Sequence, residues 1–251
     1  LDADESLAVS GALTQSGDIV IDVADNKTLT YSGAAISLGA KTLTLSGEGR
    51  LSNSNALVLN NASSKLLLSN SITVDSVRTS LASLGLDVDA NSTVTSLTVG
   101  HTTPVSIASG RTLSGAITVS AGSIKLDEAG TLASTIAMSG GTLDADESLT
   151  LSGALTQSGN ITIDVADNKT LTYSGAAVNL GAKTLTLSGG GTLSNTRDFV
   201  LNNANSKLLL NSITLGSAST SADSLGLDVN ADSTVTSLSV ANITPVSIAS
   251  G

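Results

Sequence analysis

The sequence predicts an all-β fold, an elongated parallel β-solenoid with an aliphatic core. Three observations predict it. The chain repeats itself over a long period, its short strand-like segments alternate apolar and polar residues, and its 251 residues include 1 Phe, 2 Tyr and no Trp. A core built with so few aromatic residues must be narrow, because aromatic side chains normally supply much of the buried area of a globular domain.

The chain contains a long internal repeat. The segment LDADESLAVSGALTQSG, which begins at Leu1, returns as LDADESLTLSGALTQSG at Leu143, and 84 of the 109 aligned positions are identical. The first copy has one extra residue, Ser69. We therefore expect two continuous solenoid units, a complete one at 1–142 and an incomplete one at 143–251, excerpted from a longer repetitive protein.

Short strands are predicted in order along the first unit. They cover 19–23, 27–33, 41–47, 64–68, 92–99 and 115–120. The pairs and triplets SG, DN, NN, GA and SGG separate them, and these residues form turns by adopting positive φ or by side-chain hydrogen bonds to the backbone. No helical periodicity of similar length competes with this pattern.

Differences between the copies indicate which side chains face inward. Ile19 and Ile21 are kept in the second copy, whereas the intervening Val20 becomes Thr162. A period of two with one side tolerant of polar residues is typical of a half-buried strand. Ile19, Ile21 and Val23 are therefore predicted to point into the core.

Coiling is the simplest way for such strands to share a dry interior. With roughly 20 residues per coil, one unit holds about seven coils. At ~4.8 Å between paired strands, the unit is ~34 Å long and the whole chain ~60 Å. The alternative of two tandem immunoglobulin-like sandwiches needs an aromatic core and more prolines, so we disfavour it.

Composition also limits the partners. The net charge of −10 disfavours nucleic acid and anionic membranes, which bind basic surfaces. No long apolar run of the length needed to span a bilayer exists, so no membrane insertion of this segment is predicted. Because the chain contains no cysteine, disulfides, zinc–thiolate sites and thiol nucleophiles are excluded together.

Three segments resemble a known group of proteins. GTLDADESLTLSGALTQSG at 141–159, NKTLTYSG and KTLTLSGGGTLSN look like the repeats of bacterial autotransporter passengers and haemagglutinin-like giant adhesins. The resemblance implies a right-handed parallel β-helix at the bacterial cell surface, acting as a rigid stalk or carrying adhesive loops. The general rule for parallel crossovers favours the same hand. The chain departs from the group in having no translocator domain, no RGD and no calcium-binding nonapeptide.

Acid clusters are the strongest candidates for a metal site, and Ca²⁺ is the only cofactor they indicate. The clusters are Asp2-Ala3-Asp4-Glu5, Asp144-Ala145-Asp146-Glu147, Asp87-Val88-Asp89-Ala90-Asn91 and Asp228-Val229-Asn230-Ala231-Asp232. Oxygen ligands at alternate positions suit Ca²⁺. An EF-hand loop starting at Asp87 fails, however, because Ser92 and Thr98 stand where Gly and Glu are required. Solvated turns explain the clusters better, and no metal ligand is assigned.

Catalysis is not expected. Paired carboxylates could hydrolyse glycosides, but sugar subsites normally add aromatic platforms, and only Tyr31, Tyr173 and Phe199 are present. Tyr31 and Tyr173 occupy equivalent positions, which indicates one structural role in both copies. The sole histidine, His101, is replaced by Asn242 in the second copy. We therefore predict no enzyme, no catalytic residue and no cofactor-binding residue.

Threonine pairs that flank one apolar residue are typical of ice-binding solenoids. The pairs are Thr28-Leu29-Thr30, Thr42-Leu43-Thr44, Thr93-Val94-Thr95, Thr170-Leu171-Thr172, Thr184-Leu185-Thr186 and Thr234-Val235-Thr236. The step from the second pair to the third is several times longer than the step from the first to the second, so no continuous face is expected. Threonine as an ordinary exposed strand residue is the preferred interpretation.

These observations favour a structural shaft segment of a repetitive, secreted bacterial surface protein. An adhesive module for glycan or protein is the alternative, disfavoured by the shortage of aromatic residues and arginine; an ice-binding solenoid comes third. The predicted partners are neighbouring repeats of the same chain, together with end-to-end or lateral self-association. No ligand is identified.

Overall fold

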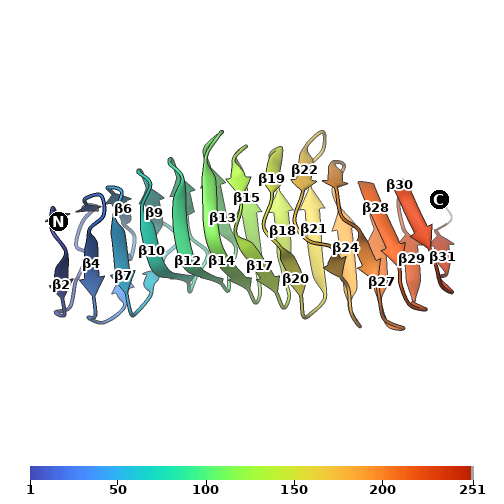
Figure 1. Ribbon diagram of the computed structural model, residues 1–251, viewed down its shortest axis with the longest axis horizontal. Helices are drawn as coiled ribbons and strands as arrows, with labels where there is room; N and C mark the ends of the chain where they lie inside the picture. Colours follow the sequence, from blue (N-terminus) through green and yellow to red (C-terminus); the bar gives the residue numbers. More distant parts are fainter. Residues whose placement is uncertain (250–251) are drawn as a thin grey trace.

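A computed structural model describes residues 1–249 as a β-solenoid, which confirms the predicted fold class. Every strand pairing is parallel, and no helix occurs among the described residues. The coils stack into an elongated molecule with the two termini at opposite ends (Figure 1). Each coil carries its strands on three faces, which we call the first, second and third face.

The first face is a continuous sheet with one strand per coil. Its strands are β1 (Asp2–Ala3), β3 (Ile19–Val23), β6 (Thr42–Ser46), β9 (Lys65–Leu68), β11 (Gly85–Val88), β13 (Thr103–Ile107), β15 (Ser123–Leu126), β18 (Thr142–Ala145), β21 (Ile161–Val165), β24 (Thr184–Ser188), β27 (Lys207–Leu210), β29 (Gly226–Val229) and β31 (Val246–Ile248). Thirteen strands in one sheet make twelve steps between coils, or ~58 Å along the axis. This agrees with the length expected from the sequence.

The second face follows the first within each coil. Its strands are β2 (Leu7–Val9), β4 (Thr28–Tyr31), β7 (Arg50–Asn53), β10 (Thr73–Thr79), β12 (Ser92–Val99), β14 (Thr112–Val119), β16 (Thr131–Leu132), β19 (Leu149–Leu151), β22 (Thr170–Tyr173), β25 (Thr192–Asn195), β28 (Thr214–Thr220) and β30 (Thr234–Val240). The third face holds β5 (Ile36–Ser37), β8 (Leu57–Leu59), β17 (Thr135–Met138), β20 (Leu155–Gln157), β23 (Val178–Asn179) and β26 (Phe199–Leu201).

The longest strands bend around the corner between the second and third faces. β10 pairs with β7 through Thr73 and Val74, and then with β8 through Val77 to Thr79. β14 does the same with β16 and β17. Gly115 lies at that bend with φ 118°, a backbone conformation that favours glycine. The two faces therefore form one continuous wall.

Coil length varies, and the corners absorb the variation. On the first face, Ile19 pairs with Leu43 and Leu86 pairs with Val105, so the coil that starts at Ile19 is longer than the one that starts at Leu86. The extra Ser69 of the first copy lies in the corner directly after β9. Because turns take up insertions more readily than paired strands, the registers on the faces are preserved.

Stacked aliphatic side chains fill the interior. On the first face, Leu43, Leu66, Leu86 and Val105 follow one another in register, and each is at most 1% exposed. Burying each such side chain contributes about 1.5–3 kcal/mol. The same core continues as one cluster from Ala3 to Leu227.

The predicted orientations and strands are confirmed. Ile21 and Val23 are buried, Ile19 is half-buried and Val20 points outward. The segments 19–23 and 92–99 match β3 and β12 to the residue, whereas β14 begins at Thr112, ahead of the predicted start at 115. The sequence pattern did not predict β10, because Asp75 and Ser76 both face outward where the strand bends and so break the alternation.

Polar side chains at a corner satisfy the backbone there. Asn60 Oδ1 accepts a hydrogen bond from the Gly39 N–H at 2.8 Å, and Ser64 Oγ donates to the Gly39 carbonyl at 2.5 Å. Asn202 and Ser206 repeat both contacts with Gly181 in the second copy. Buried backbone groups need such partners, which explains the NN and SS pairs near these corners.

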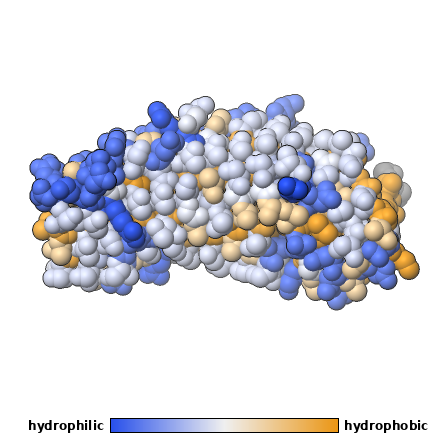
Figure 2. Space-filling model, viewed as in Figure 1, coloured by the Kyte–Doolittle hydropathy of each residue, from blue (hydrophilic) through white to orange (hydrophobic). Residues whose placement is uncertain are grey.

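The two ends of the stack differ from its middle. Figure 2 shows apolar side chains gathered at the C-terminal end. They include Val240, Ile243 and Ile248, each at least half exposed, because no further coil covers them in the described chain. On the side seen in Figure 2, much of the lateral surface between the ends is weakly polar, as expected for outward Ser and Thr.

Candidate functional site

Basic side chains reach across one coil step to acids on the neighbouring coil. The Lys27 ammonium lies 2.6 Å from a carboxylate oxygen of Glu5, and Lys169 contacts Glu147 at the same distance in the second copy. The other inter-coil pairs are Arg50–Asp75, Lys65–Asp87, Lys125–Asp144, Lys125–Asp146 and Lys207–Asp228. Exposed pairs of this kind contribute about 0.2–1 kcal/mol each, so they reinforce the stacking modestly.

These pairs involve one or more acids of each cluster considered as a calcium site. Glu5, Asp87, Asp146 and Asp228 each contact a lysine, and Asn91 Oδ1 accepts a hydrogen bond from the Thr112 N–H at 3.0 Å. Within residues 1–249, no three His, Asp or Glu side chains lie close enough together to hold a metal ion. The described clusters thus offer contacts within the chain and no observation in favour of Ca²⁺.

Lys125 is the most highly connected of the basic residues. It lies on β15 of the first face, hydrogen-bonded to the Asp146 carboxylate and 3.8 Å from Asp144. The hydrogen bond to Asp146 is the main cause that raises the pKa of Lys125, and attraction to Asp144 adds to it. Burial is the main cause that raises the pKa of Asp144 itself.

We expect the Lys125 contact to make the free energy of unfolding fall at alkaline pH, and we call this part of the pH profile the alkaline limb. Because the pKa of Lys125 is raised in the folded chain, its contribution is complete below the unfolded value of about 10.4 and is lost as pH rises through the folded value. The effect stays below ~1 kcal/mol, since the side chain is partly exposed. Lys125→Met is expected to lose this limb when thermal unfolding is compared between pH 9 and 11.

Lys183→Met is the matched control for that measurement. Lys183 makes no ion pair with any of residues 1–249, so its replacement should leave the alkaline limb unchanged. Equal loss in both variants would show that the general charge balance, and not the Asp146 contact, sets the profile.

The two tyrosines have the structural role predicted for them. The Tyr31 hydroxyl accepts a hydrogen bond from the Leu13 N–H at 3.1 Å and donates to the Ala34 carbonyl at 2.9 Å. Tyr173 repeats this with Leu155 and Ala176. Its pKa is raised by burial. Phe199 packs against the Tyr173 ring at a centroid distance of 5.9 Å.

His101 lies exposed in the corner before β13, where its carbonyl accepts a hydrogen bond from the Thr103 hydroxyl at 2.9 Å. The structure brings no second histidine or cysteine to it, since the chain contains neither.

The threonine pairs are divided between two faces, and on the second face Arg50 of β7 and Asp75 of β10 stand between the pairs of β4 and β12. The pairs at 42–44 and 184–186 lie on the first face, but those at 28–30, 93–95, 170–172 and 234–236 lie on the second. The search for pairs missed further threonines, which lie on the second-face strands between β12 and β30. These are Thr112, Thr131, Thr150, Thr192 and Thr214. Unequal corner lengths hide this alignment in the sequence, although a Thr-Leu step after a turn was a usable signal.

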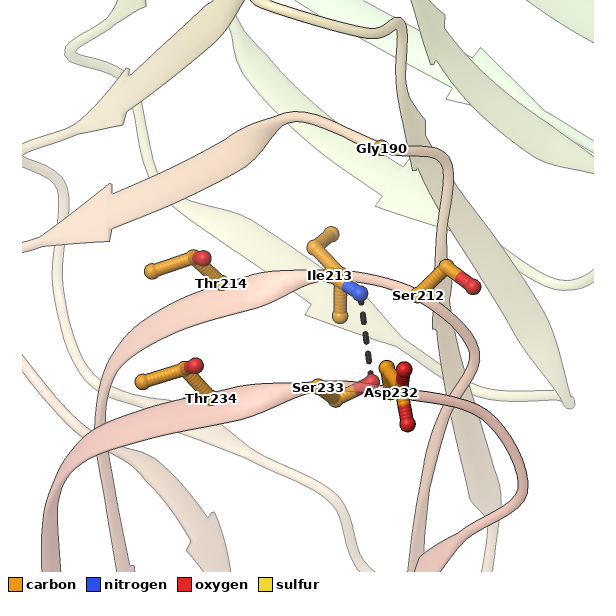
Figure 3. A pocket seen from close by; sticks show the side chains of 7 residues that line it. All are labelled: Gly190, Ser212, Ile213, Thr214, Asp232, Ser233 and Thr234. Atoms are coloured by element: carbon orange, nitrogen blue, oxygen red, sulfur yellow. Dashed lines mark hydrogen bonds between the residues drawn. The ribbon is translucent and has the colours of Figure 1, made fainter. Parts of the chain in front are cut away.

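Two shallow grooves lie along the second face. One, of about 420 Å³, is lined by Gly190, Ser212, Ile213, Thr214, Asp232, Ser233 and Thr234. Figure 3 shows Thr214 and Thr234 one above the other on adjacent strands, with Ser233 Oγ accepting a hydrogen bond from the Ile213 N–H. The other, of about 270 Å³, includes Thr131, Thr150, Thr170 and Thr172 in its lining. The threonines of the second face thus contribute to both grooves.

No family model, curated protein or solved structure matches the chain. No helix long and apolar enough to cross a membrane occurs in the part of the chain that the structure describes.

Proposed function

We propose that this chain is a shaft segment of a repetitive, secreted bacterial surface protein. The observation that carries the proposal is the unbroken parallel pairing of thirteen strands along the first face. Such pairing resists bending and proteolysis, because the strand backbone in the interior of the stack is hydrogen-bonded to the coils on both sides.

Two further features support a mechanical role. The inter-coil pairs Lys27–Glu5 and Lys65–Asp87 recur at equivalent places in the second copy, so each unit brings its own cross-links to the stack. The core is continuous and aliphatic, which suits a rod that lengthens by adding units.

The location at a bacterial surface rests on the repeats themselves. TLTYSG and TLTLSG strings resemble those of autotransporter passengers and giant adhesins, whose solenoids hold other modules away from the cell. In this proposal the segment has no catalytic activity and binds neither nucleic acid nor membrane. Direct adhesion remains the alternative, and a glycan and protein array with the purified chain would reveal it.

Immunogold electron microscopy of the source cells tests the proposal. An antibody raised against residues 1–142 should place gold in regular steps along thin surface fibres, because each repeat presents the same epitopes. Gold confined to the cell interior would overturn the surface assignment. Gold at the surface in single, unrepeated positions would contradict the repetitive shaft.

A further inference from the structure

Acids lie opposite one another on neighbouring coils of the first face. Asp144 of β18 is in register with Asp164 of β21, and Asp146 follows Asp144 two residues later in the same coil. We call these three carboxylates the acid ladder. Like charges that lie opposite each other on paired strands destabilise the pairing. The ladder therefore weakens the stack unless its charges are compensated.

A single lysine serves the whole ladder. Lys125 of β15 is in register with Asp144, but its ammonium group is hydrogen-bonded to Asp146 and lies 3.8 Å from Asp144. Asp164 makes no ion pair with any of residues 1–249, and its carboxylate accepts a hydrogen bond from the Ser188 hydroxyl. One positive charge thus faces three negative charges over three successive coils.

The other charged groups nearby do not restore the balance. Asp127, directly after β15, adds a further negative charge near Lys125, and its carboxylate accepts a hydrogen bond from the Ser106 hydroxyl at 2.6 Å. The next lysine along the stack, Lys169, is already paired with Glu147 at 2.6 Å. The excess negative charge of the ladder therefore has no second cation beside it among the described residues.

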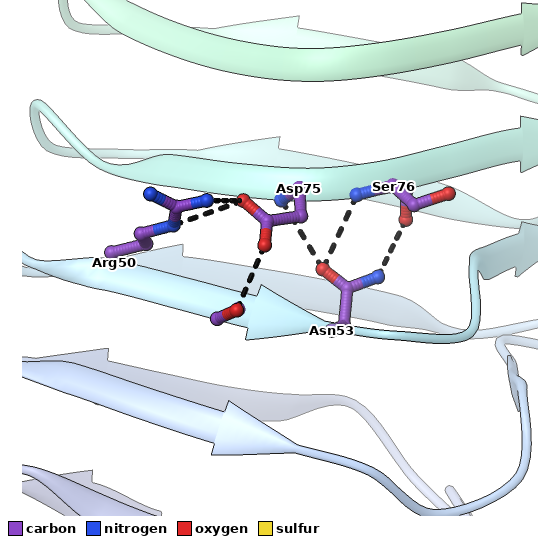
Figure 4. A network of polar contacts seen from close by, with 5 residues as sticks. Arg50, Asn53, Asp75 and Ser76 are labelled. Carbon is purple, nitrogen blue, oxygen red and sulfur yellow. Dashed lines mark hydrogen bonds and ion pairs between the residues drawn. The ribbon is translucent and has the colours of Figure 1, made fainter.

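Asp75 on the second face shows the contrasting case of a balanced carboxylate. The Arg50 guanidinium lies 2.7 Å from one of its oxygens, and the Ser52 hydroxyl donates a hydrogen bond to the other at 2.8 Å (Figure 4). One acid has one cation there, whereas three acids share one cation in the ladder. Only the ladder can gain from losing a charge.

We propose that the acid ladder makes this part of the stack respond to protons, so that the coils of β15, β18 and β21 hold together more strongly in mild acid than at neutral pH. A proton on Asp144 removes one of the opposed charges, and the carboxyl O–H can then donate a hydrogen bond to the neighbouring Asp146. Asp2 and Asp22 repeat the opposition in the first copy, with Ser46 as the hydroxyl donor to Asp22. The inference concerns the stability of the stack and does not depend on the shaft proposal.

The direction of the effect follows from the linkage between proton binding and stability. Burial is the main cause that raises the pKa of Asp144, and repulsion from Asp146 adds to it. The folded chain therefore binds more protons than the unfolded chain above the unfolded pKa of about 3.9. The stabilisation is complete below that value and is lost as pH rises through the folded pKa. A carboxylate with its own cation acts in the opposite direction, so stabilisation by mild acid distinguishes the ladder.

Native-state hydrogen exchange of the full chain tests the proposal. The β18 and β21 amides are followed from about pH 7.5 to about pH 4.5 with a chelator present, and we expect their protection factors to rise several-fold as pH falls. Asp144→Asn and Asp164→Asn should each raise protection at the neutral end and flatten its pH dependence. Each variant removes one charge from the opposed pair, and the amide oxygen can still accept a hydrogen bond.

Asp18→Asn is the matched control. Asp18 accepts a hydrogen bond from the Thr42 N–H at 2.8 Å, and Asn160 accepts the equivalent bond from Thr184 at 2.9 Å in the second copy. This variant removes one negative charge at a corner that already accommodates asparagine, and it should keep the pH dependence of the unaltered chain. Protection that falls on acidification of the unaltered chain would overturn the proposal. So would an unchanged pH dependence in Asp144→Asn, or an equal flattening in Asp18→Asn, which would assign the effect to net charge.

Discussion

Replacing Gly189 with alanine is expected to destabilise the coil that contains β24 by about 3–5 kcal/mol. Gly189 has φ 90°, and a Cβ there would overlap the Val165 carbonyl oxygen of the preceding coil. That carbonyl also accepts the Gly191 N–H at 3.0 Å. The methyl group therefore meets backbone that cannot retreat without losing an inter-coil hydrogen bond.

Two other glycines separate the contributions of strain and of close approach. Gly181 has φ 56° with nothing within 4 Å of its would-be Cβ, so Gly181→Ala should cost only about 1–2 kcal/mol, from strain alone. Gly17 has neither a clash nor a positive φ, and Gly17→Ala should be neutral or stabilising by up to ~1 kcal/mol.

Denaturant unfolding gives the ranking of these variants, and native-state hydrogen exchange of the β21 and β24 amides locates the damage. Local exchange matters because a solenoid can lose one coil without complete unfolding. If Gly189→Ala proved no worse than Gly181→Ala, close packing of coils would not be the reason for glycine at this corner.

Sequence reasoning was sufficient for the fold class because the repeat and the alternation are local signals. Leu43 and Leu45 on β6 are buried and their threonine neighbours are half-buried, as the pattern TLTLS indicates. The register between coils was not predictable, because coils of unequal length share one lattice only after the corners have absorbed the difference.

The candidate site depends on that register. The steps from Thr131 to Thr150 and from Thr150 to Thr172 differ in length along the sequence, and this irregularity argues against a common face. Parallel pairing nevertheless places them in one column. The acid clusters are the opposite case. Their spacing along the sequence suits calcium, but the fold places Asp87 and Asp228 beside lysines.

We expect the full chain to associate end to end. At the C-terminal end, Val240 is 53% and Ile248 75% exposed, whereas their counterparts Val99 and Ile107 in the first copy are at most 1% exposed. Leu1, at the other end, is 54% exposed, against 0% for its counterpart Leu143. Each end thus presents core side chains and unpaired strand backbone.

If a second copy stacks in parallel on the first, the junction covers the C-terminal end of one copy and the N-terminal end of the other. Within the chain, β15 pairs with β18, with Lys125 opposite Asp144. β1 is the equivalent of β18 in the first copy, and no strand precedes it in the sheet. A second copy's β31 can take the place of β15. The ~4.8 Å stacking then continues through the junction, and rods lengthen in multiples of one chain.

Light scattering and electron microscopy over a range of concentrations test this association. The unaltered chain should form rods that lengthen with concentration, and Val240→Lys with Ile248→Lys should remain monomeric, because charges at these two positions cannot be buried in a junction. Val20→Lys, on the outer side of β3, is the control and should still form rods. A strict monomer at high concentration for the unaltered chain would mean that exposed core residues and free strand edges are insufficient to drive stacking.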